Sequence, residues 1–115
     1  MIGPLADAPY EQLGTGVFDG DPSLSVAGLE GIRRHVGDDV QVHYVPAMST
    51  SRSREDVRFE DALQAARKSD VVVLFLGEES ILSGEAHSRA DIGLPGAQAE
   101  LVQAVRTAGK PVVAV

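Results

Sequence analysis

Two short, uninterrupted apolar runs set the strongest limit on how this chain folds. Residues 71–76 read Val-Val-Val-Leu-Phe-Leu, and residues 111–115 read Pro-Val-Val-Ala-Val. Runs rich in β-branched residues, without polar alternation, are typical of strands buried on both faces, as in a parallel sheet covered by helices. Residues 40–45 alternate between apolar and polar side chains, which predicts a strand near the edge of that sheet. Met1-Ile2 is interpreted as the end of a further strand.

Helical periodicity between these runs predicts three helices. Apolar residues at helical spacing cover 23–36, 57–68 and 95–108, and glycines that stop a helix follow the first and the third. Gly28 and Gly31 lower helix propensity, which predicts close packing of the first helix against the sheet. The order β-α-β-α-β-α-β implies right-handed crossovers between parallel strands. We therefore predict an α/β fold: a three-layer α/β/α sandwich with a mostly parallel sheet.

The ends of the chain bear on its domain organisation. Its 115 residues suit a single α/β domain. Residue 1 and residues 111–115 both fall in predicted strands, whereas a complete domain normally ends in surface tails. We expect residues 1–115 to be one domain, truncated at both ends, that is a segment of something longer.

Charge and cysteine content exclude several classes of function. The chain has 10 Lys+Arg against 17 Asp+Glu, a net charge of −7, and no cysteine. We expect no nucleic-acid partner and no polybasic contact with a membrane surface, because both need a basic patch. Disulfides and thiolate metal sites are excluded. The longest apolar run is far too short to span a membrane, and Met1 begins no secretion signal, which favours a cytoplasmic location.

The connections are of two very different lengths. Strand-to-helix connections are long, at residues 3–22, 46–56 and 77–94, whereas helix-to-strand connections are only two or three residues. All strand-to-helix loops of a parallel sheet emerge at its carboxyl edge, where open α/β folds bind their ligands. Long loops at that edge predict function there. Within the second loop, residues 49–54 predict a flexible segment.

The third loop is the richest in groups that can do chemistry. Residues 77–94 hold three glutamates, a histidine, an arginine and an aspartate. A glutamate there could act as a general acid; the alternative is a solvated acidic loop locked by an Arg89 salt bridge. Glu85, His87 and Asp91 match no metal-binding spacing, so we predict no metal site. No cofactor is predicted either, because the glycines of residues 14–20 lack the spacing of a phosphate-binding loop.

Several motifs together resemble a known family. They are Ile2-Gly3-Pro4-Leu5-Ala6-Asp7, Leu13-Gly14, Leu76-Gly77-Glu78, Ser83-Gly84-Glu85-Ala86, Ser88-Arg89, Asp91-Ile92, Leu94-Pro95-Gly96 and Gly109-Lys110-Pro111-Val112-Val113. In this order and spacing they resemble the C-terminal α/β-sandwich domain of glycoside hydrolase family 3, the β-glucosidase and β-xylosidase family. The resemblance covers essentially the whole chain.

The resemblance implies part of an active site. Enzymes of the family are retaining glycosidases with two carboxylates. The nucleophilic aspartate belongs to a preceding barrel, to which nothing here corresponds. Glu85 matches the acid/base residue, with Glu78 as runner-up, and Arg89 and Asp91 would shape the loop near the sugar. Gly84 would let the backbone approach closely.

The implied partners are therefore a β-glucoside or β-xyloside and the missing N-terminal barrel. The isolated chain would be inactive, because it lacks the nucleophile. The alternative is a non-catalytic structural or dimerisation module that covers a barrel. Exposed sheet edges could also pair two copies into a homo-oligomer.

Overall fold

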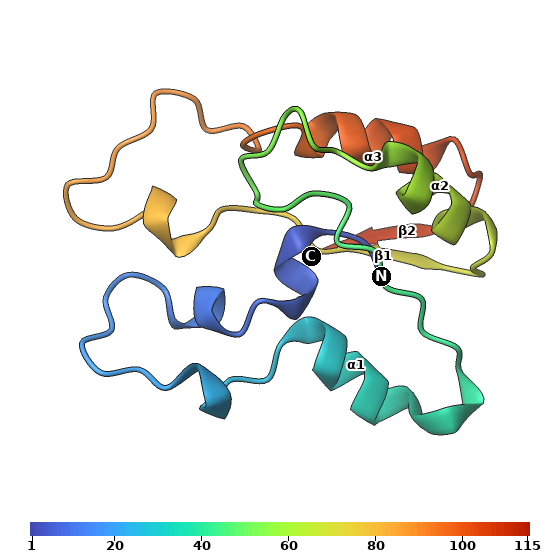
Figure 1. Cartoon of the computed structure of the whole chain (residues 1–115), viewed down its shortest axis with the longest axis horizontal. Helices are drawn as coiled ribbons and strands as arrows, with labels where there is room; N and C mark the ends of the chain where they lie inside the picture. The colour runs from blue at the N-terminus through green and yellow to red at the C-terminus, as the bar shows by residue number, and fades with distance from the viewer.

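The computed structural model describes residues 1–115 and is an α/β sandwich, as the sequence predicts (Figure 1). Its regular elements are α1 (Gly28–Val36), α2 (Phe59–Arg67), β1 (Val72–Leu74), α3 (Gln98–Arg106) and β2 (Val112–Ala114). Five short 3-10 helices lie in the connections: Pro4–Asp7, Tyr10–Leu13, Pro22–Leu24, Gly37–Asp39 and Ser80–Leu82. No helix is long and apolar enough to cross a membrane.

The sheet is parallel throughout. β1 pairs with β2 in the register Val72 to Val112, and Ile2 forms parallel bridges to Leu74 on one side and to Val45 on the other. The spatial order of the four segments is therefore residue 45, residue 2, β1, β2. The chain moves outward from the segment of residue 2 to that of residue 45 and then crosses back to β1, which makes a topological switch point between residue 2 and β1.

The helices form layers on both faces of this sheet, with α1 on one side and α2 and α3 on the other (Figure 1). The core lies under α2 and α3. Its buried residues are Ile2, Ala47, Met48, Ala62, Ala66, Val72, Leu74, Leu101 and Val105. On the opposite face the ring of Phe75 lies so close to Gly28 that a Cβ there would stand 2.3 Å from it. The predicted close packing at Gly28 is confirmed, whereas Gly31 has only Val26 nearby.

The predicted strand at 40–45 is wrong over most of its length. Only Val45 forms a bridge, supported by hydrogen bonds from its N–H to the Met1 carbonyl and from the Gly3 N–H to its own carbonyl. Met1 also donates to the carbonyl of His43. Residues 40–42 form no strand and no bridge.

The helices begin later than their apolar patterns predict, and local contacts explain where. The Asp21 carboxylate accepts a hydrogen bond from the Ser23 N–H and caps a 3-10 turn, so α1 starts only at Gly28. Gly96 has φ +65°, outside the helical region, so α3 starts at Gln98 rather than at Pro95. The loops before α1 and α3 are therefore longer than predicted.

Candidate functional site

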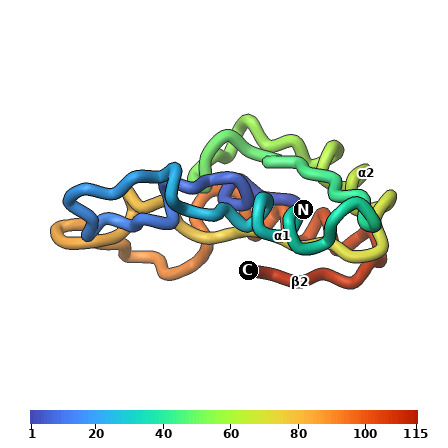
Figure 2. Tube along the Cα trace, turned by 90° about the horizontal axis from the view of Figure 1, so that it is seen from below, coloured from blue at the N-terminus to red at the C-terminus, as the bar shows by residue number.

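The long loops meet at the carboxyl edge of the strands, as the topology predicts. Residues 8–25 and 78–95 project together from one end of the flat molecule (Figures 1 and 2). They are joined where the Ser80 N–H donates to the Glu11 carboxylate. Residues 46–58 cross the base of this projection. All three loops therefore contribute to one region.

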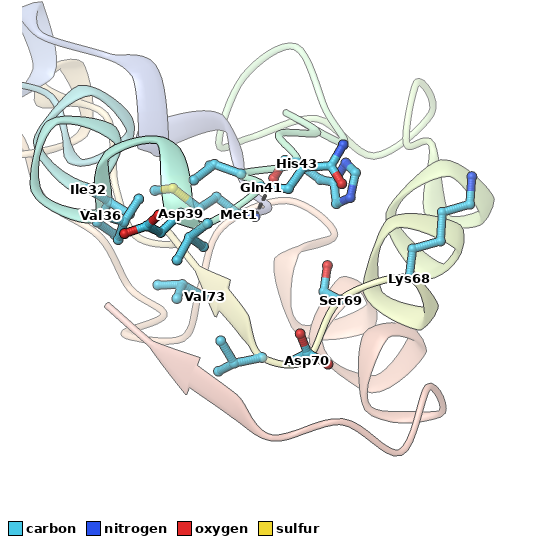
Figure 3. Close-up of a pocket in the computed structure, with 13 residues that line it drawn as sticks. Met1, Ile32, Val36, Asp39, Gln41, His43, Lys68, Ser69, Asp70 and Val73 are labelled. Carbon is cyan, nitrogen blue, oxygen red and sulfur yellow. Dashed lines mark hydrogen bonds between the residues drawn. The ribbon is translucent and has the colours of Figure 1, made fainter.

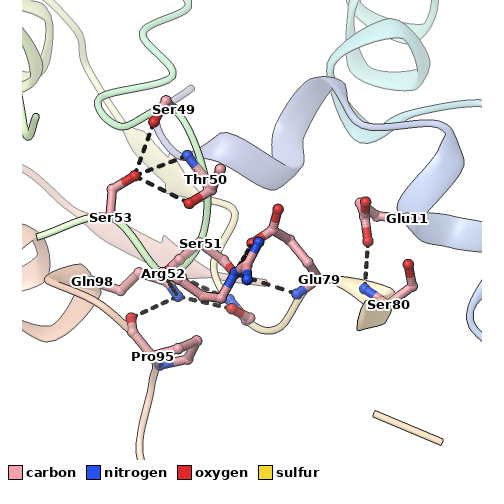
Figure 4. A network of polar contacts seen from close by, with 11 residues as sticks. Glu11, Ser49, Thr50, Ser51, Arg52, Ser53, Glu79, Ser80, Pro95 and Gln98 are labelled. Atoms are coloured by element: carbon pink, nitrogen blue, oxygen red, sulfur yellow. Dashed lines mark hydrogen bonds and ion pairs between the residues drawn. The ribbon is translucent and has the colours of Figure 1, made fainter. Parts of the chain in front are cut away.

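Glu79 links the second and third loops at their base (Figure 4). Its carboxylate accepts a hydrogen bond of 2.8 Å from the Ser51 hydroxyl and one of 3.1 Å from Arg52 Nε. Ser51 is completely buried. The segment predicted to be a flexible loop is thus a loop whose centre is hydrogen bonded to the neighbouring loop.

Gln98 connects the same two loops from below. This residue is completely buried in the first turn of α3. Its amide hydrogen bonds with backbone groups of Gly77, Pro95 and Ser51 (Figure 4). The two ends of the third loop are thus fixed to each other.

Glu78, Arg89 and Asp91 are engaged with other groups of the third loop. Arg89 forms an ion pair with Glu78 and donates to the Gly93 carbonyl at 2.9 Å. Asp91 accepts a hydrogen bond of 2.7 Å from the Gly93 N–H. These contacts join distant parts of the loop into one piece. Contact of Arg89 or Asp91 with a sugar stays a prediction.

Glu85 lies at the exposed tip of the same loop, where its side chain makes no hydrogen bond or ion pair with the rest of the chain. Both neighbours have positive φ: Gly84 at +110° and Ala86 at +63°. A Cβ at position 84 would stand 2.3 Å from the Thr15 hydroxyl oxygen. Positive φ at a non-glycine residue is strained, and such strain gathers at functional sites.

Two of the hollows on the surface have similar volumes, about 400 Å³ each. One, at the carboxyl edge, is lined by residues of the first and third loops, among them Tyr10, Thr15 and His87. The other lies at the opposite end of the strands, between α1 and the sheet (Figure 3). Aliphatic side chains such as Ile32, Val36 and Val73 make up about half of its lining. The rest is polar and includes Asp39, His43, Lys68, Ser69 and Asp70.

The ionisable groups of the region are not arranged around a metal. No group of three His, Cys, Asp or Glu residues is placed to hold a metal ion. In the second loop, hydrogen bonds from the hydroxyls of Ser49 and Ser53 hold the pKa of Asp56 below its ordinary value. That carboxylate therefore serves the internal structure of its loop.

The sequence analysis includes Glu79 among the glutamates of the third loop but assigns no role to Glu11, Ser51, Arg52 or Gln98. A glutamine directly after Pro-Gly-Ala gives no sign that its amide will be buried, because an amide at a helix start is usually solvated. Only the folded chain brings residues 51, 77, 95 and 98 together.

Fold and site together define a class: an α/β sandwich domain whose functional edge carries an acidic loop. The model of the glycosyl hydrolase family 3 C-terminal domain matches residues 1–115. The chain therefore belongs to this family, as the motifs of its sequence predict.

Relatives place the chain within larger proteins. It is 38% identical to a β-xylosidase of Formosa agariphila and 31% identical to a periplasmic β-glucosidase of Salmonella typhimurium, in both cases over 100% of this chain. The match covers 16% and 18% of those relatives, so the chain spans less than a fifth of their length.

Solved structures agree with the fold. A family 3 exo-β-xylosidase in complex with a xylobiose aziridine activity-based probe matches 98% of this chain and 14% of its own, with a TM-score of 0.81 and 32% identity. A β-glucosidase involved in saponin metabolism from intestinal bacteria matches with the same TM-score at 26% identity, over 98% of this chain and 20% of its own.

Proposed function

We propose that this chain is the C-terminal domain of a retaining β-glucosidase- or β-xylosidase-like enzyme, and that its third loop supplies Glu85 as the acid/base residue. The substrate is a terminal β-glycoside, bound between this domain and a catalytic barrel that carries an aspartate nucleophile. The relatives named above are β-xylosidases and β-glucosidases, which supports this substrate class.

The assignment rests on the contacts of the three glutamate side chains of the third loop, because only one of them makes no ion pair or hydrogen bond. Glu78 pairs with Arg89, and Glu79 accepts hydrogen bonds from Ser51 and Arg52. Glu85 alone is exposed and unpaired within the chain. A general acid must reach the oxygen that it protonates, and a carboxylate already occupied by a guanidinium is badly placed to do so.

The position of Glu85 also suits a site shared by two domains. Retaining hydrolysis requires carboxyl groups about 5–5.5 Å apart. A projecting loop whose base is fixed and whose tip is exposed can bring a carboxyl group that close to a residue of a facing domain. Arg89 and Asp91 would hold the shape of the tip beside the sugar.

The proposed reaction has two steps. In the first, Glu85 donates its proton to the glycosidic oxygen while the barrel aspartate attacks the anomeric carbon, which releases the aglycone and forms a glycosyl-enzyme. In the second, the Glu85 carboxylate takes a proton from water. The water oxygen then attacks the anomeric carbon and frees the aspartate.

Glu85→Gln in the full-length enzyme tests this assignment. General acid–base catalysis contributes typically about 10²–10⁴-fold. We expect a loss of this order in kcat/KM for aryl glycosides with poor leaving groups, and a much smaller loss for activated ones that leave unprotonated. Glu100→Gln, an exposed glutamate on α3, is the matched control.

Two further variants separate the candidates. Glu85→Ala should be rescued by azide with formation of a β-glycosyl azide, because azide needs no general base. If Glu78→Gln shows the dependence on the leaving group and Glu85→Gln does not, the acid/base residue is Glu78. If neither shows it, the acid/base proposal fails.

A second candidate function is a non-catalytic module that covers the barrel or joins two copies. Val113 and Val115, at the outer strand of the sheet, are 50% and 64% exposed, and an exposed strand edge can pair with another chain. This alternative predicts an apparent mass that rises with concentration in size-exclusion chromatography, and unchanged kinetics for both glutamate variants.

A further inference from the structure

The side chain of Gln98 is surrounded by backbone polar groups. Its Nε2 lies 2.8 Å from the Gly77 carbonyl and 3.0 Å from the carbonyls of both Ser51 and Pro95. Its Oε1 accepts a hydrogen bond of 2.8 Å from the Gly77 N–H. The residue has no solvent exposure, and every one of its polar atoms is satisfied.

The backbone partners of Gln98 lie at the two ends of the third loop and in the second loop. Gly77 is where the third loop leaves β1, and Pro95 is where the loop returns toward α3. The Ser51 carbonyl belongs to the second loop (Figure 4). One amide therefore closes the base of the projection that carries Glu85 and fixes it to its neighbour.

A side-chain amide suits this role. It donates two hydrogens and accepts at the oxygen, and this site requires donation to carbonyls together with acceptance from one N–H. A methionine of similar shape supplies neither, and it leaves the part-buried Gly77 N–H without its partner. A glutamate accepts from Gly77 but places a charge against three carbonyl oxygens.

We propose that Gln98 is a positioning residue for proton transfer by Glu85. By holding the two ends of the loop at a constant separation, it sets where the tip stands relative to the facing domain. This inference rests on the proposed function of Glu85. A misplacement of about 1 Å can cost about 10²-fold in rate, and the exposed tip has few contacts of its own that could correct one.

Gln98→Met in the full-length enzyme tests the inference, with Gln103→Met, an exposed position on α3, as the matched control. We expect a loss in kcat/KM of about 10- to 100-fold for glycosides with poor leaving groups. For activated leaving groups we expect less than a threefold loss, because the acid is then not needed. An equal loss for both classes of substrate overturns the proposal.

The double variant Gln98→Met/Glu85→Gln separates this inference from the function on which it rests. If Gln98 acts through Glu85, removing the acid abolishes the effect of Gln98→Met on poor leaving groups. If the two losses multiply while Glu85→Gln alone behaves as the loss of an acid, the role of Gln98 fails and that of Glu85 survives. If Glu85→Gln alone shows no dependence on the leaving group, the proposed function itself fails.

Gln98→Glu gives a second readout that a purely structural role would not move. Protonation of the introduced carboxyl restores one donor toward the three carbonyls. Its activity on poor leaving groups, relative to the unsubstituted enzyme, should therefore rise as the pH falls, while that of Gln98→Met should not. A constant activity ratio at all pH values contradicts the proposed positioning role of Gln98. Failure of both variants to fold also contradicts it, because Gln98 would then be a residue of global stability.

Discussion

Gly96→Ala probes a close backbone contact at the base of the candidate site. A Cβ at this position would stand 2.6 Å from the Ser51 carbonyl oxygen and 2.7 Å from the Ser53 carbonyl oxygen. Both neighbours are backbone atoms that cannot rotate away. Gly109 is a matched control, because its φ of +68° is nearly the same as the +65° of Gly96 and nothing lies within 4 Å of its Cβ position.

The expected magnitudes follow from two separate costs. A left-handed conformation costs a non-glycine residue about 1–2 kcal/mol. Loss of chain entropy in the unfolded state offsets about 0.4–1 kcal/mol of this. Gly109→Ala should therefore lower the free energy of unfolding by about 1 kcal/mol. Gly96→Ala carries the same cost and an overlap with backbone, and forced overpacking adds about 1–3 kcal/mol.

Urea unfolding followed by circular dichroism measures both variants against the unsubstituted chain. With a denaturant slope of about 1–3 kcal/mol per molar urea, the midpoint of Gly96→Ala should fall roughly 1 M below that of Gly109→Ala. Equal midpoints for the two variants would refute the argument, because they would show that the second loop does not press against Gly96.

Three further predictions concern the loops and the isolated domain. Because the hydroxyls of Ser49 and Ser53 lower the folded pKa of Asp56, its stabilisation is present above the ordinary carboxyl pKa and is lost as the pH falls through the lower folded value. Asp56→Asn should therefore lower Tm near neutral pH and reduce the fall of Tm below about pH 4. If Tm falls with acid as steeply in the variant as in the unsubstituted chain, this prediction is contradicted. Ala86→Gly should raise the free energy of unfolding by up to about 1 kcal/mol, since it relieves a φ of +63°, and a clear decrease in urea experiments would argue against that conformation. The 115-residue chain alone should not hydrolyse aryl β-glucosides or β-xylosides, and turnover abolished by Glu85→Gln would show that one domain suffices.

The pattern of apolar residues along the sequence was enough to predict the helices and the main strands of the fold. The apolar runs at 71–76 and 111–115 contain β1 and β2, and each predicted helix contains an observed one. These patterns reflect burial, which a run of Val and Leu requires wherever it lies. Helix starts were less predictable: α3 begins at Gln98 rather than at Pro95, because Gly96 has a φ of +65°. In the fold the backbone of residues 51–53 lies close against that glycine.

The family motifs located the candidate loop, but they did not rank its glutamates by physical contact. Nothing in the order of residues 78, 79 and 85 says that the first meets Arg89 and the second meets Ser51 and Arg52. These pairs join residues up to 28 positions apart in the sequence. The contacts of Glu79 with Ser51 and Arg52 join two different loops, which a parallel sheet brings to the same edge.

By itself the sequence determined an α/β sandwich, the family and the loop in which an acid could lie. The local periodicity of apolar residues and the linear order of motifs carry that information directly. Only the tertiary structure decided that Gln98 closes the base of the loop and that Glu85 is left unpaired at its tip. Hydrogen bonds between residues 51, 77, 95 and 98 depend on the distances between loops, which are set once the helices pack on the sheet.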